Sequence, residues 1–304
     1  MFAIFEAILP IFLLVVLGMA FNPMKFPASG FWVAADRITY YVFLPALIIE
    51  KLATTSFTLS DFYSLTSVLM IAVLVIALLT VAIRRLVPVS SAAYTSVFQG
   101  SIRPNSYVAL AAALALYGPK GLALTAIVMA GVIPLVNILC ITSFSYYVPK
   151  KGQGRHGIFK SVISNPLVIA CAIGIFLNVT RVGLPYFSND LFKILSSAAL
   201  PMGLISVGYG LSLSGSKAQI FPVILASTLK LIAMPVLTYF LLDIFSVDDF
   251  RSSVAMLFSS VPCAVSSYIL AGHLNGDQKL MATIITIETL VAFATMPIIL
   301  ALLT

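Results

Sequence analysis

The stretch of sequence that decides the fold reads Gln99-Gly100-Ser101-Ile102-Arg103-Pro104-Asn105-Ser106-Tyr107, and it lies near the middle of an apolar segment from 90 to 116. Pro104 lacks a backbone donor and frees the carbonyl of Gly100, so a helix through this segment must break here. In lipid, free backbone groups survive only beside protein or a water-filled cavity. In a membrane-spanning segment the stretch therefore predicts an interrupted helix, with Arg103 and Asn105 at a polar centre.

A second interruption lies in the apolar segment from 250 to 273, which contains Ser259-Ser260-Val261-Pro262-Cys263-Ala264-Val265-Ser266-Ser267-Tyr268. Pro262 follows Pro104 by 158 residues, and serine hydroxyls surround it. Interrupted helices at corresponding positions of two halves are the best sequence indication of a transport site near the middle of the membrane. We therefore expect the two breaks to meet there.

The composition requires lipid as a solvent. Hydrophobic residues make up 61% of the 304 residues, charged residues 9%, and the mean hydropathy is +1.11. Ordinary soluble domains are about half apolar and a quarter charged. So few charges cannot cover a water-exposed body of this size, which excludes a soluble globular enzyme. At about 30 residues for each span and its connection, the chain allows about ten spanning helices.

Charged, Gly-rich and Pro-rich clusters divide the chain into apolar segments. These are 3–21, 31–53, 62–83, 90–116, 119–148, 158–179, 188–213, 217–245, 250–273 and 277–303. The longest polar interval, 149–157, falls near the midpoint. It predicts a cytoplasmic linker between a first repeat of five helices at 1–148 and a second at 158–304.

The two halves match along one diagonal, which indicates a duplication. The pairs at an offset of 156 residues are Pro10 with Pro166, Gly18 with Gly174, Asn22 with Asn178, Arg37 with Lys193 and Leu44-Pro45 with Leu200-Pro201. Gly118 matches Gly276 at an offset of 158, as Pro104 matches Pro262. Because five spans is an odd number, the second half enters the membrane from the opposite side. We expect an all-α integral membrane fold of ten transmembrane helices in two inverted repeats, with helices four and nine broken and crossing. Such repeats favour alternating access.

The orientation follows from Lys and Arg in short loops, which are retained in the cytoplasm. With the N-terminus outside, the inner loops hold Lys25, Arg84, Arg85, Lys150, Lys151, Arg155, Lys160, Lys217 and Lys279, and the outer ends hold Lys51, Lys120, Arg181, Lys193 and Arg251. The larger inner group predicts a multi-pass protein of the plasma membrane, the inner membrane in a bacterium, with both termini outside and the central loop in the cytoplasm.

The chemistry of the predicted crossing favours an anion. Each second half-helix begins with free backbone donors and the positive end of its dipole, and Arg103 adds a full charge. The candidate substrate-binding residues are Arg103, Pro104, Asn105, Tyr107, Pro262 and Ser266. The alternative is a pair of ordinary proline kinks in which Arg103 is anchored to a carbonyl.

Two further charges, Lys230 and Glu288, lie near the centres of apolar segments and must face away from lipid. Each needs a partner, and they could pair with one another. Lys230 could serve as an internal cation, and Glu288 as a proton carrier or a ligand of a coupling ion, H⁺ or Na⁺. The alternative is a static ion pair that fixes helix packing. Glu50 and Lys51, at the end of a segment, are expected to reach outward to the interface.

Other classes of function find little support. The Lys and Arg residues form no stripe with interleaved aromatics, which argues against nucleic acid. Cys140, Cys171 and Cys263 lie in separate apolar runs and fit neither a disulfide framework nor a zinc site. We expect no metal site, no cofactor and no catalytic residue. An intramembrane enzyme needs paired aspartates or a metal-binding helix, whereas the adjacent Asp248 and Asp249 lie at a helix end.

Several motifs, in their order and spacing, resemble the auxin efflux carrier family. They are Arg103-Pro104-Asn105-Ser106-Tyr107, Tyr117-Gly118, Ser164-Asn165-Pro166-Leu167, Ala199-Leu200-Pro201, Leu229-Lys230-Leu231, Met234-Pro235, Val261-Pro262 and Asp277. The family includes bacterial malate and malonate permeases and is distantly similar to bile acid sodium symporters. The resemblance runs nearly from end to end. The short central loop is more typical of a prokaryotic permease than of a plant auxin carrier.

The resemblance implies a scaffold of helices 1, 2, 6 and 7 and a transport core of helices 3–5 and 8–10. The core would move in an elevator-like cycle, often within a dimer, so a homodimer is one expectation. The family carries organic anions, and Asn105 stands at the position expected to touch substrate. We predict a secondary transporter of a small organic anion, a mono- or dicarboxylate of the auxin or malate and malonate type. An anion channel or a membrane sensor with the same fold remains the alternative.

Overall fold

A computed structural model of the chain describes residues 2–28, 30–55, 59–148, 166–184, 187–211 and 220–303. The regular structure of these residues is helical, apart from one isolated antiparallel bridge between Pro104 and Cys263. The predicted linker at 149–157 and the start of the predicted second repeat lie outside the described residues.

The helices follow the predicted apolar segments, and several of those segments contain two pieces. In the first half the elements are α1 (Phe2–Met24), α2 (Phe31–Ile38), the π-helical η1 (Thr39–Phe43), α3 (Leu44–Thr54), α4 (Leu59–Ala82), the 3₁₀ turn η2 (Ile83–Leu86), α5 (Ser91–Ile102) and α6 (Ser106–Tyr147). In the second half they are α8 (Pro166–Val179), α9 (Phe187–Tyr209), α10 (Ile220–Thr228), the π-helical η4 (Leu229–Ala233), α11 (Met234–Ile244), α12 (Asp249–Ser260), α13 (Ser266–His273) and α14 (Gln278–Leu303).

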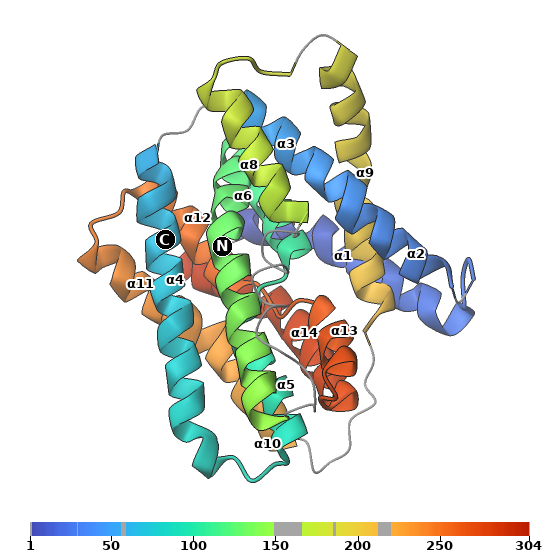
Figure 1. Cartoon of the computed structure of the whole chain (residues 1–304), viewed down its shortest axis with the longest axis vertical. Coiled ribbons are helices and arrows are strands. Elements are labelled where there is room, and N and C mark those ends of the chain that lie inside the picture. The colour runs from blue at the N-terminus through green and yellow to red at the C-terminus, as the bar shows by residue number, and fades with distance from the viewer. Residues whose placement is uncertain are drawn as a thin grey trace.

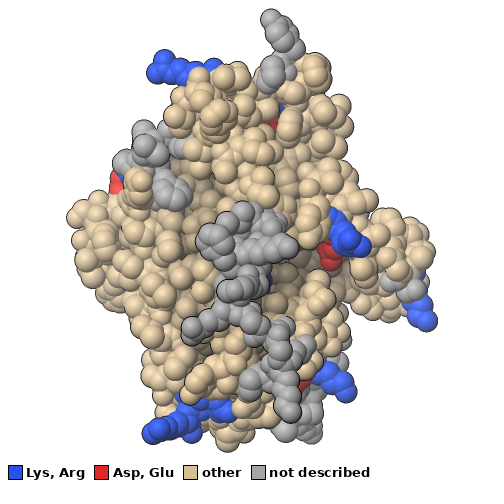
Figure 2. Space-filling model, viewed as in Figure 1, with Lys and Arg blue, Asp and Glu red and all other residues tan. Residues whose placement is uncertain are grey.

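Within the described residues, seven helices are long and apolar enough to cross a membrane. Lys and Arg lie mainly toward the margins of the face in Figure 2, and uncharged side chains cover most of the rest. The chain is therefore an all-helical integral membrane protein. The helices α5, α12 and α13 have only 12, 12 and 8 residues, and at 1.5 Å per residue none alone crosses a hydrocarbon core of about 30 Å.

Glycine and proline explain where the long segments bend. Gly118 interrupts α6 with φ 64° and ψ −161°, a conformation that favours glycine, and Pro119 follows it. The stretch from Ser106 to Tyr147 is thus two helices joined by a kink, as the cut between the segments 90–116 and 119–148 predicts. The π-helical turns η1 and η4 each precede a helix with proline at its start, Pro45 in α3 and Pro235 in α11.

The helices pack in two groups (Figure 1). One contains α1, α2, α3, α8 and α9, in the upper part and on the right of the view, and the other contains α4, α5, α6 and α10 to α14. Close backbone approach joins α1 to α9, because a Cβ on Gly18 would collide with the carbonyl of Ile205 and one on Gly208 with the carbonyl of Val15. The two groups meet where α1, α3, α8 and α9 contact α6, and where α1 contacts α14.

Candidate functional site

The two interrupted helices are joined at their breaks by backbone contacts. The backbone nitrogen of Asn105 donates to the carbonyl of Pro262 at 2.9 Å, and Pro104 pairs with Cys263 in an antiparallel bridge. Each proline removes a helical donor, so the extended residues around it must find partners outside their own helix. Here each break supplies part of the other's partners, which brings Pro104 and Pro262 together in the interior.

Asn105 begins α6 and leaves one polar group unused. Its Oδ1 accepts from the backbone nitrogens of Tyr107 and Val108, both at 3.2 Å, as a helix N-cap does. The residue is 1% exposed, and its Nδ2 has no hydrogen-bond partner. A buried donor without a partner is costly, so this amide is ready to donate to a bound acceptor.

Arg103 reaches from the same break to three neutral oxygens. Its Nη2 donates to Asn137 Oδ1 at 3.1 Å and to Ser266 Oγ at 3.5 Å, and its Nη1 donates to Gln99 Oε1 at 3.5 Å. None of these partners carries a charge, so they orient the guanidinium and leave its positive charge uncompensated. The structure thus brings Arg103 and Ser266 together, and the carbonyl oxygens that accept from the guanidinium belong to the side chains of Asn137 and Gln99.

Tyr107 lies at the boundary between the two groups of helices. Its ring packs on Gly203 of α9, where a Cβ would collide with it. Within the first group of helices, Ser206 Oγ of α9 donates to Asp36 Oδ1 of α2 at 2.6 Å. The first turn of α6 therefore faces α9 directly.

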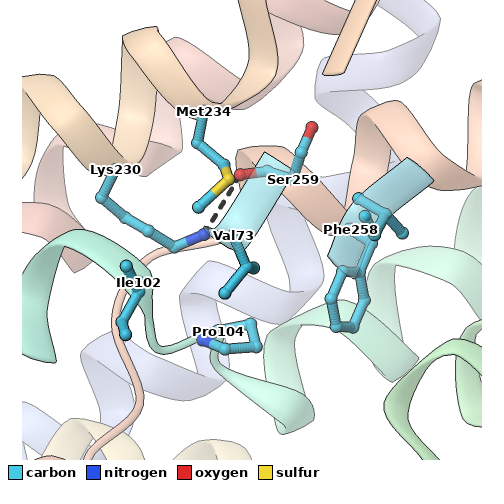
Figure 3. Close-up of a pocket in the computed structure, with 8 residues that line it drawn as sticks. Val73, Ile102, Pro104, Lys230, Met234, Phe258 and Ser259 are labelled. Carbon is cyan, nitrogen blue, oxygen red and sulfur yellow. Dashed lines mark hydrogen bonds between the residues drawn. The ribbon is translucent and has the colours of Figure 1, made fainter. Parts of the chain in front are cut away.

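Lys230 lies inside the protein near the crossing, which is the point where the breaks at Pro104 and Pro262 are joined. It is 2% exposed, and its Nζ donates to the carbonyl of Ser259 at 3.2 Å, near the C-terminal end of α12 (Figure 3). The side chain comes from the π-helical turn η4, a distortion frequent at functional sites. A cavity of about 10 Å³, just enough for one water molecule, separates it from Pro104 and is also lined by Leu69, Val73, Ile102, Met234, Phe258 and Ser259.

Glu288 of α14 is fully buried and contacts both breaks. Its Oε2 accepts from the backbone nitrogen of Cys263 at 2.9 Å, whereas its Oε1 has no hydrogen-bond partner. Gly100 of α5 lies against it, since a Cβ on this glycine would be 3.5 Å from Oε1. Glu288 and Lys230 do not pair directly: each bonds to backbone at the break between α12 and α13.

Glu50 differs from its prediction. It is 4% exposed and pairs with Lys51, whose Nζ lies 2.9 Å from Glu50 Oε2, so the carboxylate is turned inward and not toward the interface. The sequence around Glu50 is apolar, and it did not indicate that this carboxylate would be buried.

Sequence reasoning missed two residues that orient the site, Asn137 and Gln99. Both are polar residues within apolar segments, a signal that could have marked them. Cys263 was predicted only to be buried, and all three cysteines are indeed buried and unpaired; its backbone nitrogen is the group that holds Glu288. Among the described residues no three His, Cys, Asp or Glu side chains come together as a metal site would require.

Comparisons with known proteins find transporters. A family model described as membrane transport protein matches residues 156–300. An uncharacterized transporter of Methanocaldococcus jannaschii is 28% identical over 181 residues, 58% of each chain. An uncharacterized transporter of Methanothermobacter thermautotrophicus is 26% identical over 148 residues, 48% of each chain. The matches thus span about half the length of these curated relatives. Residues 156–300, somewhat less than half of the chain, thus match a family of membrane transport proteins, and the chain is similar to transporters of two archaea.

Proposed function

We propose that this chain is a secondary transporter that moves a small organic anion, a mono- or dicarboxylate, across the plasma membrane by alternating access. The observation that carries the proposal is the unpaired Nδ2 of Asn105, buried beside the point where two interrupted helices are joined. A static kink would need no free donor at this depth, because an unused buried donor lowers stability.

The polarity of the crossing supports an anion. The helices α6 and α13 both begin at their breaks, so the positive ends of their dipoles lie there. Arg103 adds a charge that its neutral partners do not cancel. A carboxylate could take one hydrogen bond from Asn105 Nδ2 and a charge-assisted bond from Arg103, with Tyr107 and Ser266 beside it.

The architecture that fits this function has ten spans in two inverted five-helix repeats. In this arrangement α5 with the first part of α6 forms the fourth span, and α12 with α13 forms the ninth. The support is that each pair is interrupted by a proline at corresponding places, Pro104 and Pro262. The two termini would lie outside the cell and the linker at 149–157 in the cytoplasm, as the Lys and Arg distribution predicts.

In an elevator-like motion, the two packed groups of helices would move relative to one another. The group of α1, α2, α3, α8 and α9 would be the scaffold, and the group that holds the crossing would move past it. The packing of the two groups supports this division, as does the contact of Tyr107 with Gly203 at their boundary. A homodimer through the scaffold group is compatible with this motion.

The test is counterflow in proteoliposomes that contain the purified full chain. Vesicles loaded with one unlabelled carboxylate are diluted into the same carboxylate with a radioactive label, using acetate, malonate, malate and indole-3-acetate in turn. A transporter accumulates label transiently and saturably. Current without saturation would identify a channel, and binding without flux a sensor; either result would contradict the proposal.

A further inference from the structure

We propose that Glu288 binds one proton together with each substrate anion, so that the carrier couples anion uptake to proton uptake. This inference rests on the proposed function and deepens it by naming the coupling ion and its site. It is carried by the placement of Glu288 between the two breaks, with one carboxylate oxygen bonded and the other unused.

The surroundings of Glu288 fit a neutral carboxylic acid. Oε2 accepts a hydrogen bond from Cys263, as either protonation state allows. Oε1 lies beside Gly100, whose carbonyl Pro104 deprives of its helical donor. A proton on Oε1 would supply a donor on this side of the carboxyl, next to the negative C-terminal end of the α5 dipole, whereas an ionised oxygen there would be repelled by that end.

Because Lys230 is nearby, a proton on Glu288 changes the net charge of the site. With Glu288 ionised, the two buried side chains have no net charge, and with Glu288 protonated the pair carries one positive charge. Lys230 cannot move far, because it is enclosed and its Nζ is bonded to the Ser259 carbonyl. The crossing therefore becomes more positive by one charge when Glu288 takes a proton, and in a low-dielectric interior this attracts an anion strongly.

The charged and titratable groups around Glu288 come from three segments of the chain. Lys230 approaches Glu288 from η4 and the Cys263 thiol from the break between α12 and α13, while Arg103, at the break between α5 and α6, acts on the Cys263 thiol. The neighbouring α10 contains no titratable residue, and Glu6 of α1 is exposed. On α13, Tyr268 is 42% exposed and His273 lies at the C-terminal end. Glu288 is thus the buried acid of this region.

A proton fits this place better than a sodium ion. Sodium needs several oxygen ligands, and here one carboxylate oxygen is unused. A proton changes the charge by the same amount and needs no such shell.

Coupling follows from thermodynamic reciprocity. If protonation of Glu288 raises the affinity for the anion, then anion binding must raise the affinity for the proton by the same factor. Loading is then favoured on the side with more protons, and loss of the proton on the other side weakens the hold on the anion.

The experiment measures proton uptake on anion binding to the purified full chain. Malonate is titrated calorimetrically between pH 7 and pH 9, where its own carboxyls are ionised, in two buffers of different ionisation enthalpy. If malonate shows no counterflow, the carboxylate from the same screen that does is used. We expect uptake of up to one proton per anion, and a Kd that rises by up to tenfold per pH unit as the coupled proton is lost.

The variant Glu288→Gln keeps the shape of the side chain and cannot ionise. It should bind malonate with a Kd independent of pH and without proton uptake, and an inward proton gradient should not accelerate its transport. The matched control is Glu50→Gln, which changes another buried glutamate, paired with Lys51 on α3. This control should behave as the wild type does.

The outcomes separate the two proposals. Absence of counterflow with every carboxylate would contradict the proposed function and this inference with it. Counterflow without proton uptake in the wild type, or uptake driven by a sodium gradient, would overturn the inference and leave the transporter standing. A wild type that takes up no proton overturns the inference even where Glu288→Gln does not fold.

Discussion

The backbone nitrogen of Asn105 donates to the carbonyl of Pro262 at 2.9 Å, which ties the break in one half of the chain to the break in the other. Neither interrupted helix can satisfy its own backbone at the proline. The two breaks therefore form one structural unit, which Glu288 of α14 also contacts through the backbone nitrogen of Cys263.

Arg103 is expected to contribute to anion affinity through its uncompensated charge. Replacement by Gln keeps a polar side chain and removes the charge. Loss of one charge-assisted hydrogen bond, worth about 2 kcal/mol, should weaken carboxylate binding roughly 30-fold. Counterflow at varied substrate concentration measures the change. Lys193→Gln, on the exposed surface of α9, is the matched control, and equal affinity in the two variants would remove Arg103 from the site.

Asn105 has two separable roles, as a helix cap and as a donor. Asn105→Ala removes both and should cost about 1 kcal/mol of stability from the lost cap. Asn105→Asp keeps the accepting oxygen and replaces the donor by a negative oxygen, so it should remain folded while carboxylate affinity falls at least tenfold. Thermal unfolding and counterflow on the same samples distinguish the two effects. Undiminished transport by the Asp variant would show that Nδ2 does not meet the anion.

Lys230 and Glu288 should be energetically coupled although no direct bond joins them. Lys230→Met leaves Glu288 without its compensating charge and should destabilise the protein by about 3 kcal/mol. Adding Glu288→Gln removes the stranded charge, so the double variant should be more stable than the sum of the single effects predicts. Denaturant unfolding in the same detergent measures all four proteins. Strict additivity would mean that the two charges do not interact.

Asp248, at the N-terminus of α12 and outside the long apolar helices, should give an acid-dependent contribution to stability. Partial desolvation raises the pKa of this carboxyl, but hydrogen bonds from the Arg251 backbone and side chain outweigh it and lower the pKa below 3.8. A lowered folded-state pKa means that the stabilisation is complete well above pH 3.8 and is lost as the pH falls through the folded-state value.

The variant Asp248→Asn, which retains a capping oxygen, tests this expectation. The stability difference from wild type should be constant between pH 6 and pH 8 and should shrink below about pH 4. Thermal unfolding across this range provides the measurement. A difference that grows on acidification would reverse the assigned sign.

The local features of the fold could be predicted from the sequence, because proline and glycine act on their own neighbourhood. The breaks at Pro104 and Pro262 and the kink at Gly118 each follow from the backbone chemistry of one residue. Apolar segments likewise predict where helices run, within a few residues of the observed ends.

The hydrogen-bond partners of side chains that are far apart in the sequence could not be predicted in the same way. Lys230 and Glu288 were identified as buried charges, but they bond to Ser259 and Cys263 and not to one another, because backbone groups freed by the second break compete for them. The contact of Arg103 with Asn137 depends on how α6 folds back past the crossing. Such pairs are set by tertiary packing, which periodicity and spacing do not contain.

The burial of Cys140, Cys171 and Cys263 makes the natural chain a convenient background for site-directed labelling. Thiols enclosed in apolar surroundings react slowly with maleimides, because the reactive thiolate does not form there. A single cysteine introduced on an exposed loop would accept a fluorophore or spin label without prior removal of the native ones. Pairs of such labels on α4 and α9 could then report distances during turnover in an otherwise unaltered protein.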